Sequence, residues 1–214
     1  MNLMCDGVIF DVDGTIWDST AVVEHAWNKA FEHAGFDIKV TAGQLKGLFG
    51  LPMDVILERV MPGSTVEERN LIQNSCYKYE QEFLEREPGA LFPGICEAIQ
   101  ELSRKMPVYI VSNCQSGYIE LVLKKTGLED YVADYNCFGD TGLYKAENIK
   151  LMVEKHGLKH PVYVGDTVMD ADACKKAGVR FIYAAYGFGK ADNFDAIIYD
   201  PEDIVYLFDD AFGK

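Results

Sequence analysis

Asp11 and Asp13 stand one residue apart, directly after the apolar run Val8-Ile9-Phe10. A run of this kind favours a buried strand, and alternate residues of a strand point to the same side. Two carboxylates at close range repel each other, and burial penalises each charge further. The pair is therefore costly unless the carboxylates do chemistry, as metal ligands, nucleophile or proton carrier.

Further polar side chains stand at comparable places later in the chain, just after two other apolar runs or in the segment between them. In open parallel sheets, ligands bind beyond the carboxyl ends of the strands, so we expect these side chains to converge with the aspartate pair. The residues are Ser112, Asn113, Lys145, Asp166 and Asp170.

Three or four carboxylates at one point cannot all stay ionised without a cation, and Mg²⁺ is the hard cation that such oxygen ligands favour. The metal, Lys145 and the positive start of a helix after Ser116 would together form a local anion site. Such a site can bind a phosphate group. Phosphoryl transfer also needs a nucleophile and a group that protonates the leaving oxygen, tasks that Asp11 and Asp13 can divide.

The elements that must position these residues follow an alternating pattern. Short apolar runs alternate with segments of helical period, most of which are closed by Gly or Pro. This order predicts an α/β fold with a doubly wound, Rossmann-like parallel sheet covered on both faces. The predicted strands are Val8–Phe10, Val108–Val111, Val162–Val164, Phe181–Ala184 and Ala196–Ile198, and the predicted helices are Ile95–Lys105, Ile119–Lys125, Ile149–His156 and Met169–Ala177.

One stretch departs from the alternation. Between the first and second predicted strands the sequence contains only helical patterns, separated by Gly and Pro residues. We expect an inserted all-helical cap domain at residues 18–86, and an α/β core domain built from residues 1–17 and 87–214. The predicted cap helices are Ala21–Ala34, Ala42–Phe49, Met53–Val60 and Val66–Leu84.

Composition limits the class of partner. The 214 residues carry a net charge of −14, which disfavours nucleic acid and anionic membranes as partners but allows a small anionic substrate at a locally positive site. The first residues do not resemble a signal peptide, and the six cysteines show no zinc-like spacing. We expect a cytoplasmic protein with free thiols, and the sequence leaves its oligomeric state open.

Four segments, "DVDGT" (11–15), "VSN" (111–113), Lys145 and "GDTVMD" (165–170), resemble the signature motifs of the haloacid dehalogenase superfamily, in the expected order. The resemblance covers nearly the whole chain, and the helical insert resembles that superfamily's small cap. The stretches "GLFGLP" (47–52), "FPG" (92–94) and "YGFG" (186–189) resemble the phosphoglycolate phosphatase-like branch. One departure is Ala146 after Lys145, where the family often has proline.

The resemblance implies a role for each motif residue. Asp11 would attack phosphorus and form an aspartyl-phosphate, and Asp13 would protonate the leaving alcohol and then activate water. Lys145 would neutralise the nucleophile and the transferring group. Phosphate oxygens would be bound by Ser112 and Asn113, and Mg²⁺ by Asp11, the Asp13 carbonyl, Asp166 and, directly or through another group, Asp170.

The resemblance implies a Mg²⁺-dependent phosphatase acting on a small phosphorylated metabolite, phosphoglycolate-like or a sugar phosphate. A phosphomutase resembling β-phosphoglucomutase, a pyrophosphatase or nucleotidase, and a catalytically silent binding module are the alternatives. Such mutases carry a histidine early in the first cap helix, whereas His25 lies further along. Lys46, in the insert, resembles the basic residue that related caps aim at the substrate, although a solvated helix lysine is an equal alternative.

Overall fold

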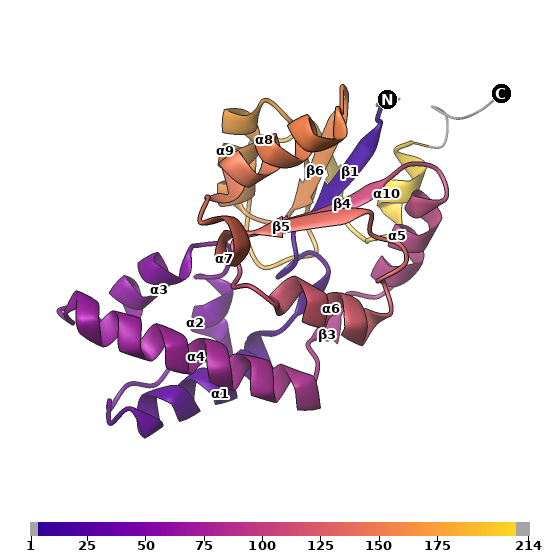
Figure 1. Cartoon of the computed structure of the whole chain (residues 1–214). Coiled ribbons are helices and arrows are strands. Elements are labelled where there is room, and N and C mark those ends of the chain that lie inside the picture. Colours follow the sequence, from indigo (N-terminus) through magenta and orange to yellow (C-terminus); the bar gives the residue numbers. More distant parts are fainter. Residues whose placement is uncertain (1–3, 209–214) are drawn as a thin grey trace.

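The computed structural model describes residues 4–208. Within them, six parallel strands form one sheet in the order β5-β4-β1-β6-β7-β8 (Figure 1). The first strand in the sequence, β1, lies centrally between β4 and β6, with Phe10 opposite Ile110 and Val164. The strands are β1 (Gly7–Phe10), β4 (Val108–Ser112), β5 (Asp134–Cys137), β6 (Pro161–Gly165), β7 (Arg180–Ala184) and β8 (Ala196–Ile198).

Helices cover both faces of this sheet, as the doubly wound prediction requires. Val8 and Phe10 of β1 pack on the face that contacts α5 and α6, whereas Ile9 packs on the face that contacts α8 and α9. Because both faces are covered, β1, β4 and β6 are buried along their whole length, which explains their continuous apolar runs. These helices are α5 (Ile95–Ser103), α6 (Tyr118–Thr126), α8 (Lys145–His156) and α9 (Val168–Ala177).

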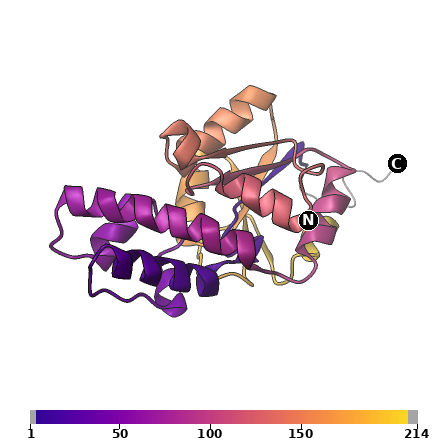
Figure 2. The same ribbon diagram turned by 60° about the horizontal axis from the view of Figure 1, so that its bottom comes forward.

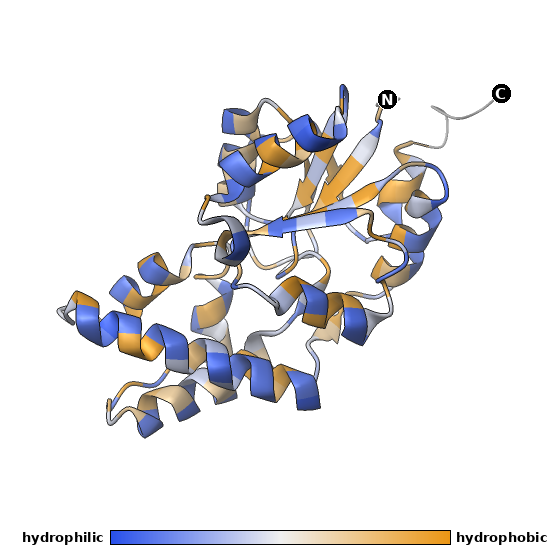
Figure 3. Ribbon diagram, in the orientation of Figure 1, coloured by the Kyte–Doolittle hydropathy of each residue, from blue (hydrophilic) through white to orange (hydrophobic). Residues whose placement is uncertain are grey.

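The five predicted strands and four predicted core helices are confirmed, but the sheet has a sixth strand that the apolar pattern missed. This strand, β5, has the sequence Asp-Tyr-Asn-Cys and lies at the edge of the sheet. Figure 3 shows that β5 is largely hydrophilic, in contrast to β1. Two short helices, α7 (Phe138–Thr141) and α10 (Asp203–Tyr206), were also not predicted.

The four predicted helices of the insert are present, and α1 and α4 pack side by side (Figure 2). Threonines cap two of them through capping boxes, Thr41 with Gln44 and Thr65 with Glu68. The predicted helix at 42–49 is shorter than expected, because Gly47 ends it. The helices are α1 (Thr20–His33), α2 (Ala42–Lys46), α3 (Met53–Val60) and α4 (Val66–Arg86).

The chain enters and leaves this helical segment through two short strands. These are β2 (Trp17–Asp18) and β3 (Ala90–Leu91), which pair antiparallel with Trp17 opposite Leu91 and Asp18 opposite Ala90. The division into a core of residues 1–17 and 87–214 and a cap of residues 18–86 stays a prediction. Among the described helices, none is long and apolar enough to cross a membrane.

Candidate active site

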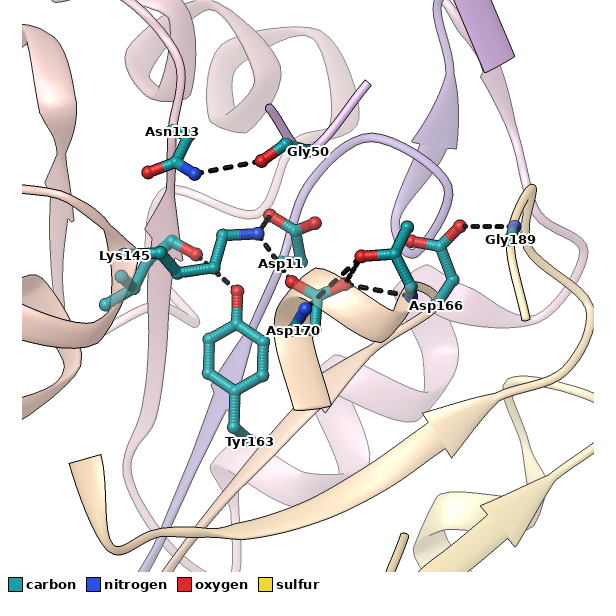
Figure 4. Close-up of polar contacts among 10 residues, drawn as sticks. Asp11, Gly50, Asn113, Lys145, Tyr163, Asp166, Asp170 and Gly189 are labelled. Atoms are coloured by element: carbon teal, nitrogen blue, oxygen red, sulfur yellow. Dashed lines mark hydrogen bonds and ion pairs between the residues drawn. The ribbon is translucent and has the colours of Figure 1, made fainter. Parts of the chain in front are cut away.

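The carboxyl ends of β1 and β6 bring three aspartates together. Asp11 follows β1, where its backbone N–H donates to the carbonyl of Val164 at 2.9 Å, and Asp166 follows β6. Asp170 lies in the first turn of α9. One carboxylate oxygen from each aspartate lies within 4.8 Å of the others, and all three residues are buried (Figure 4). The predicted convergence at this sheet edge is therefore present in the structure.

Lys145 is the first residue of α8 and supplies a positive charge to this cluster. Its Nζ lies 3.0 Å from Asp11 Oδ1 and donates a hydrogen bond of 2.6 Å to Asp170 Oδ1. Burial lowers the pKa of Lys145, but the charges of Asp11 and Asp170 outweigh burial and raise it overall. Burial raises the pKa of Asp11, and the charge of Lys145 opposes that rise. The lysine is thus held charged between two carboxylates.

Both oxygens of Asp170 are engaged by the protein itself. Oδ1 accepts from Lys145, and Oδ2 accepts from the Thr167 backbone N–H at 2.9 Å and the Thr167 hydroxyl at 2.6 Å. Thr167 caps α9 in return, since its hydroxyl accepts from the Asp170 N–H. This arrangement fixes the carboxylate of Asp170 toward Lys145 and leaves it the least suited of the three to bind a metal.

Asp166 differs from Asp170, because only one of its carboxylate oxygens accepts hydrogen bonds from the described residues. Oδ2 accepts from the backbone N–H groups of Phe188 and Gly189 at 2.7 and 3.3 Å. Within the described residues, the buried Oδ1 has no hydrogen-bond partner. Burial, followed by the charges of Asp170 and Asp11, raises the pKa of Asp166 to about 8.

Two glycines let the backbone close around Asp166. Gly14 has a φ of +84°, and a Cβ there would lie 2.4 Å from Asp166 Oδ2. At Gly187, a Cβ would lie 2.3 Å from the Asp166 Cβ and 2.4 Å from the Gly14 carbonyl oxygen. The glycines of "DVDGT" and "YGFG" are therefore required by the close approach of three backbone segments.

These residues fit a hard divalent cation. The buried, unpartnered oxygen of Asp166 needs a positive partner, and Asp11 stands beside it. Carboxylate oxygens are the ligands that Mg²⁺ prefers. Asp11 and Asp166 would hold such an ion, together with the Asp13 carbonyl that the family resemblance implies.

Asp13 lies apart from the cluster, on the side of a cavity between the sheet and the helices α1, α3 and α4. Its Oδ1 accepts hydrogen bonds from the Ser19 hydroxyl at 2.6 Å and the Tyr118 hydroxyl at 2.8 Å. Trp17 Nε1 in turn donates to the Tyr118 oxygen at 3.2 Å. Burial raises the pKa of Asp13 to about 7, although the bonds from Ser19 and Tyr118 oppose the rise. A carboxyl with such a pKa exchanges protons readily near neutrality.

Ser112 and Asn113 line the same cavity as Asp11 and Asp13. Ser112 is the last residue of β4 and is buried. The side chain of Asn113 turns toward the insert, where its Nδ2 donates to the Gly50 carbonyl at 2.9 Å (Figure 4). The amide nitrogen of Asn113 thus contacts the segment between α2 and α3.

Lys46 is not brought to the site residues. Its Nζ forms a 2.7 Å ion pair with Asp18 and lies 5.2 Å from the centre of the Phe188 ring. The described residues that line the cavity include neither Lys46 nor His25, and His25 is exposed on α1. A role for Lys46 in substrate binding stays a prediction.

Sequence reasoning missed three residues, of which Tyr118 and Glu80 line the cavity and Ser19 contacts Asp13. Tyr118 contacts Asp13 from 105 residues further along the chain, so no local pattern connects them, and Ser19, six residues after Asp13, belongs to no motif that the sequence analysis used. Glu80 had a detectable signal: the buried residues of α4 fall at 72, 76, 80 and 84, so Glu80 occupies a position of its apolar stripe. A charged residue in such a stripe indicates a specific partner or function.

Comparisons with known proteins agree with this geometry. The family model described as haloacid dehalogenase-like hydrolase matches residues 8–184. The phosphoglycolate phosphatase of Vibrio parahaemolyticus is 25% identical over 201 residues, covering 88% of this chain and 87% of that protein. The phosphoglycolate phosphatase of Agrobacterium fabrum is 28% identical over 189 residues, covering 84% and 80%.

Among solved structures, a haloacid dehalogenase-like family hydrolase of Streptococcus pneumoniae superposes with a TM-score of 0.83 at 20% identity. The match covers 95% of this chain and 98% of that protein, and it establishes the fold. The family match extends from β1 to the end of β7 and contains every candidate site residue. The chain therefore belongs to the haloacid dehalogenase-like hydrolase family.

Proposed function

We propose that this hydrolase is a Mg²⁺-dependent phosphatase that cleaves a small phosphomonoester through an aspartyl-phosphate intermediate. The names of the curated relatives support phosphatase chemistry. The observation that carries the proposal is the contact between Asp11 and Lys145 at 3.0 Å, at the edge of a cavity that also contains Asp13. A carboxylate held beside a buried ammonium is suited to attack an anionic phosphoryl group, because the lysine offsets the repulsion between them.

In the first half of the reaction, an Asp11 oxygen forms a bond to phosphorus while the bond from phosphorus to the leaving oxygen breaks. Asp13 delivers its proton to that oxygen, which therefore leaves as an alcohol hydroxyl and not as an alkoxide. In the second half, Asp13 takes a proton from water, which attacks the phosphorus of the aspartyl-phosphate. Phosphate is released and the Asp11 carboxylate is restored.

The surrounding residues hold these groups in place. Mg²⁺, bound by Asp11, Asp166 and the Asp13 carbonyl, would supply positive charge at the transferring phosphoryl group. Asp170 acts through Lys145, since both of its oxygens are already used by the protein. Ser112 and Asn113, which line the cavity with Asp11, would bind phosphate oxygens.

The proposal is tested with p-nitrophenyl phosphate and Mg²⁺, comparing wild type with Asp11→Asn. Asparagine has nearly the same shape but is not a nucleophile, so turnover should fall on the order of 10³-fold or more. Asp130→Asn, at an exposed position, is the matched control and should retain wild-type turnover. Circular dichroism checks that both variants are folded. An Asp11→Asn variant that keeps more than a tenth of the wild-type rate would contradict the assignment.

A further inference from the structure

The cavity at Asp11 and Asp13 contains a third acidic group, which belongs to the insert. Glu80 of α4 is 6% exposed and lines this cavity together with Asp11 and Asp13. Its Oε2 accepts a 2.8 Å hydrogen bond from Trp27 Nε1, and its Oε1 accepts a 2.9 Å bond from Gln115 Nε2. Both donors are neutral, so the carboxylate is hydrogen-bonded but, among residues 4–208, has no opposite charge paired with it.

No positively charged side chain stands among the described residues that line the cavity. Lys145 contacts Asp11 and Asp170, and Lys46 is paired with Asp18. In the proposed reaction the metal and Lys145 serve the phosphoryl group. Neither of them neutralises Glu80, which lines the cavity that would hold the leaving group of a substrate bound at Asp11.

The wall around Glu80 is aromatic. Trp27, Phe49 and Tyr77 line the same cavity, with the rings of Trp27 and Phe49 6.5 Å apart. Aromatic faces attract cations, and a carboxylate among aromatic rings is a typical binding site for an ammonium group. The space is small, about 50 Å³, which favours a short leaving group.

We propose that Glu80 selects a short phosphomonoester whose leaving alcohol bears a positively charged amino group. The inference rests on the proposed phosphatase function and narrows its substrate class. An ammonium group gains an ion pair with Glu80 and contacts with the rings, whereas a carboxylate meets like charge with no cation to offset it. Burial raises the pKa of Glu80, so a cation that arrives beside it also compensates for the cost of its charge. Phosphoglycolate, the substrate in the names of the relatives, is therefore disfavoured.

Three substrates that differ only in the end group of a two-carbon alcohol test the inference. They are 2-aminoethyl phosphate, 2-hydroxyethyl phosphate and carboxymethyl phosphate, which is phosphoglycolate. With Mg²⁺ and wild-type protein, kcat/KM should be at least tenfold higher for the amino compound than for the hydroxy compound, and lowest for the carboxylate. Equal or better turnover of either of the other two compounds overturns the inference.

Glu80→Gln tests the residue itself. Glutamine can still accept from Trp27, and Gln115 can turn its amide to accept from the new N–H₂ group, so the contacts can be kept while the charge is removed. The kcat/KM ratio of the amino to the hydroxy compound should fall toward one. Glu85→Gln removes a charge from an exposed position of the same helix and should leave the ratio unchanged. An unchanged ratio in Glu80→Gln overturns the role of Glu80.

Failure of the inference is distinguishable from failure of the proposed function. If p-nitrophenyl phosphate is hydrolysed and none of the three compounds is, the phosphatase function stands and the substrate class is wrong. If no phosphomonoester is hydrolysed, p-nitrophenyl phosphate included, the proposed function itself is wrong. Should Glu80→Gln fail to fold, the wild-type order of the three substrates decides.

Discussion

Replacing Lys145 by methionine tests whether the buried lysine holds the aspartate cluster together. Methionine keeps an unbranched chain but removes the ammonium group, which leaves Asp11 and Asp170 buried at 2% and 0% exposure without their cation. Breaking a buried ion pair by removing one partner costs about 3–5 kcal/mol. We expect a loss of that size in the free energy of unfolding, measured by urea denaturation in excess chelator at pH 8.

The second variant, Asp170→Asn, separates charge from packing. Asparagine can keep the oxygen that accepts from Thr167, so Lys145→Met with Asp170→Asn removes one of the two stranded carboxylate charges. The double variant should be more stable than the sum of the single losses predicts, with a coupling energy of about 1–3 kcal/mol.

Acidity provides an independent check on the same variant. In Lys145→Met the pKa of Asp11, already raised by burial, should rise further. At any pH above 3.8, the ordinary pKa of an aspartate, the folded state then binds more protons than the unfolded state. Stability is then lost as pH rises, and the difference from wild type should be larger at pH 8 than at pH 5. Single losses that add to within about 0.5 kcal/mol, with no dependence on pH, would refute the reasoning.

Three further outcomes are expected. The first concerns Asp13→Asn with p-nitrophenyl phosphate, whose leaving oxygen needs no proton. Stopped-flow absorbance should show a burst of product about equal to the enzyme concentration, followed by slow turnover. A linear trace at the wild-type rate would exclude Asp13 as the base. Excess chelator should abolish activity and Mg²⁺ should restore it, whereas Ca²⁺ should inhibit because its looser coordination disturbs the in-line geometry; full turnover in chelator would contradict the metal requirement. Because burial raises the pKa of Glu80, the wild type should lose stability relative to Glu80→Gln as pH rises above 4.5. A difference in melting temperature between the two proteins that stays constant from pH 4.5 to 8 would argue against a buried charge.

Much of the fold follows from the sequence because its signals are local. The strands β1, β4 and β6 are buried on both faces, so each reads as a continuous apolar run. Because the strands are parallel, Asp11 after β1 and Asp166 after β6 stand at the same edge of the sheet. The strand β5 gave no such signal, because an edge strand needs no apolar sequence. Its pairing with β4 depends on the tertiary structure.

The site was predictable where residues act close to their own strand, and not where the insert reaches it. The contacts of Asp13 with Tyr118 and of Asn113 with Gly50 join segments far apart in the chain, and only the folded structure brings them together. The sequence also does not predict the direction of the Lys46 side chain, because its helix could present that side chain either to the cavity or to Asp18. In the structure it pairs with Asp18. Contacts between the helices and the sheet thus decide what local patterns leave open.

The pairing of β2 with β3 makes the helical insert topologically equivalent to a hairpin loop. Trp17 stands opposite Leu91 and Asp18 opposite Ala90, an antiparallel geometry that a turn of two residues is able to close. The four helices therefore occupy the place of a tight turn, and they leave and rejoin the sheet domain at one point. A chain with such a turn in their place would keep every strand of the main sheet in order. It would lose Gly50 and Glu80 from the cavity, and Asp13 would lose the hydrogen bond from Ser19. The carboxylates at the edge of the sheet and the groups that the insert adds to the cavity are thus encoded by separate segments of one chain.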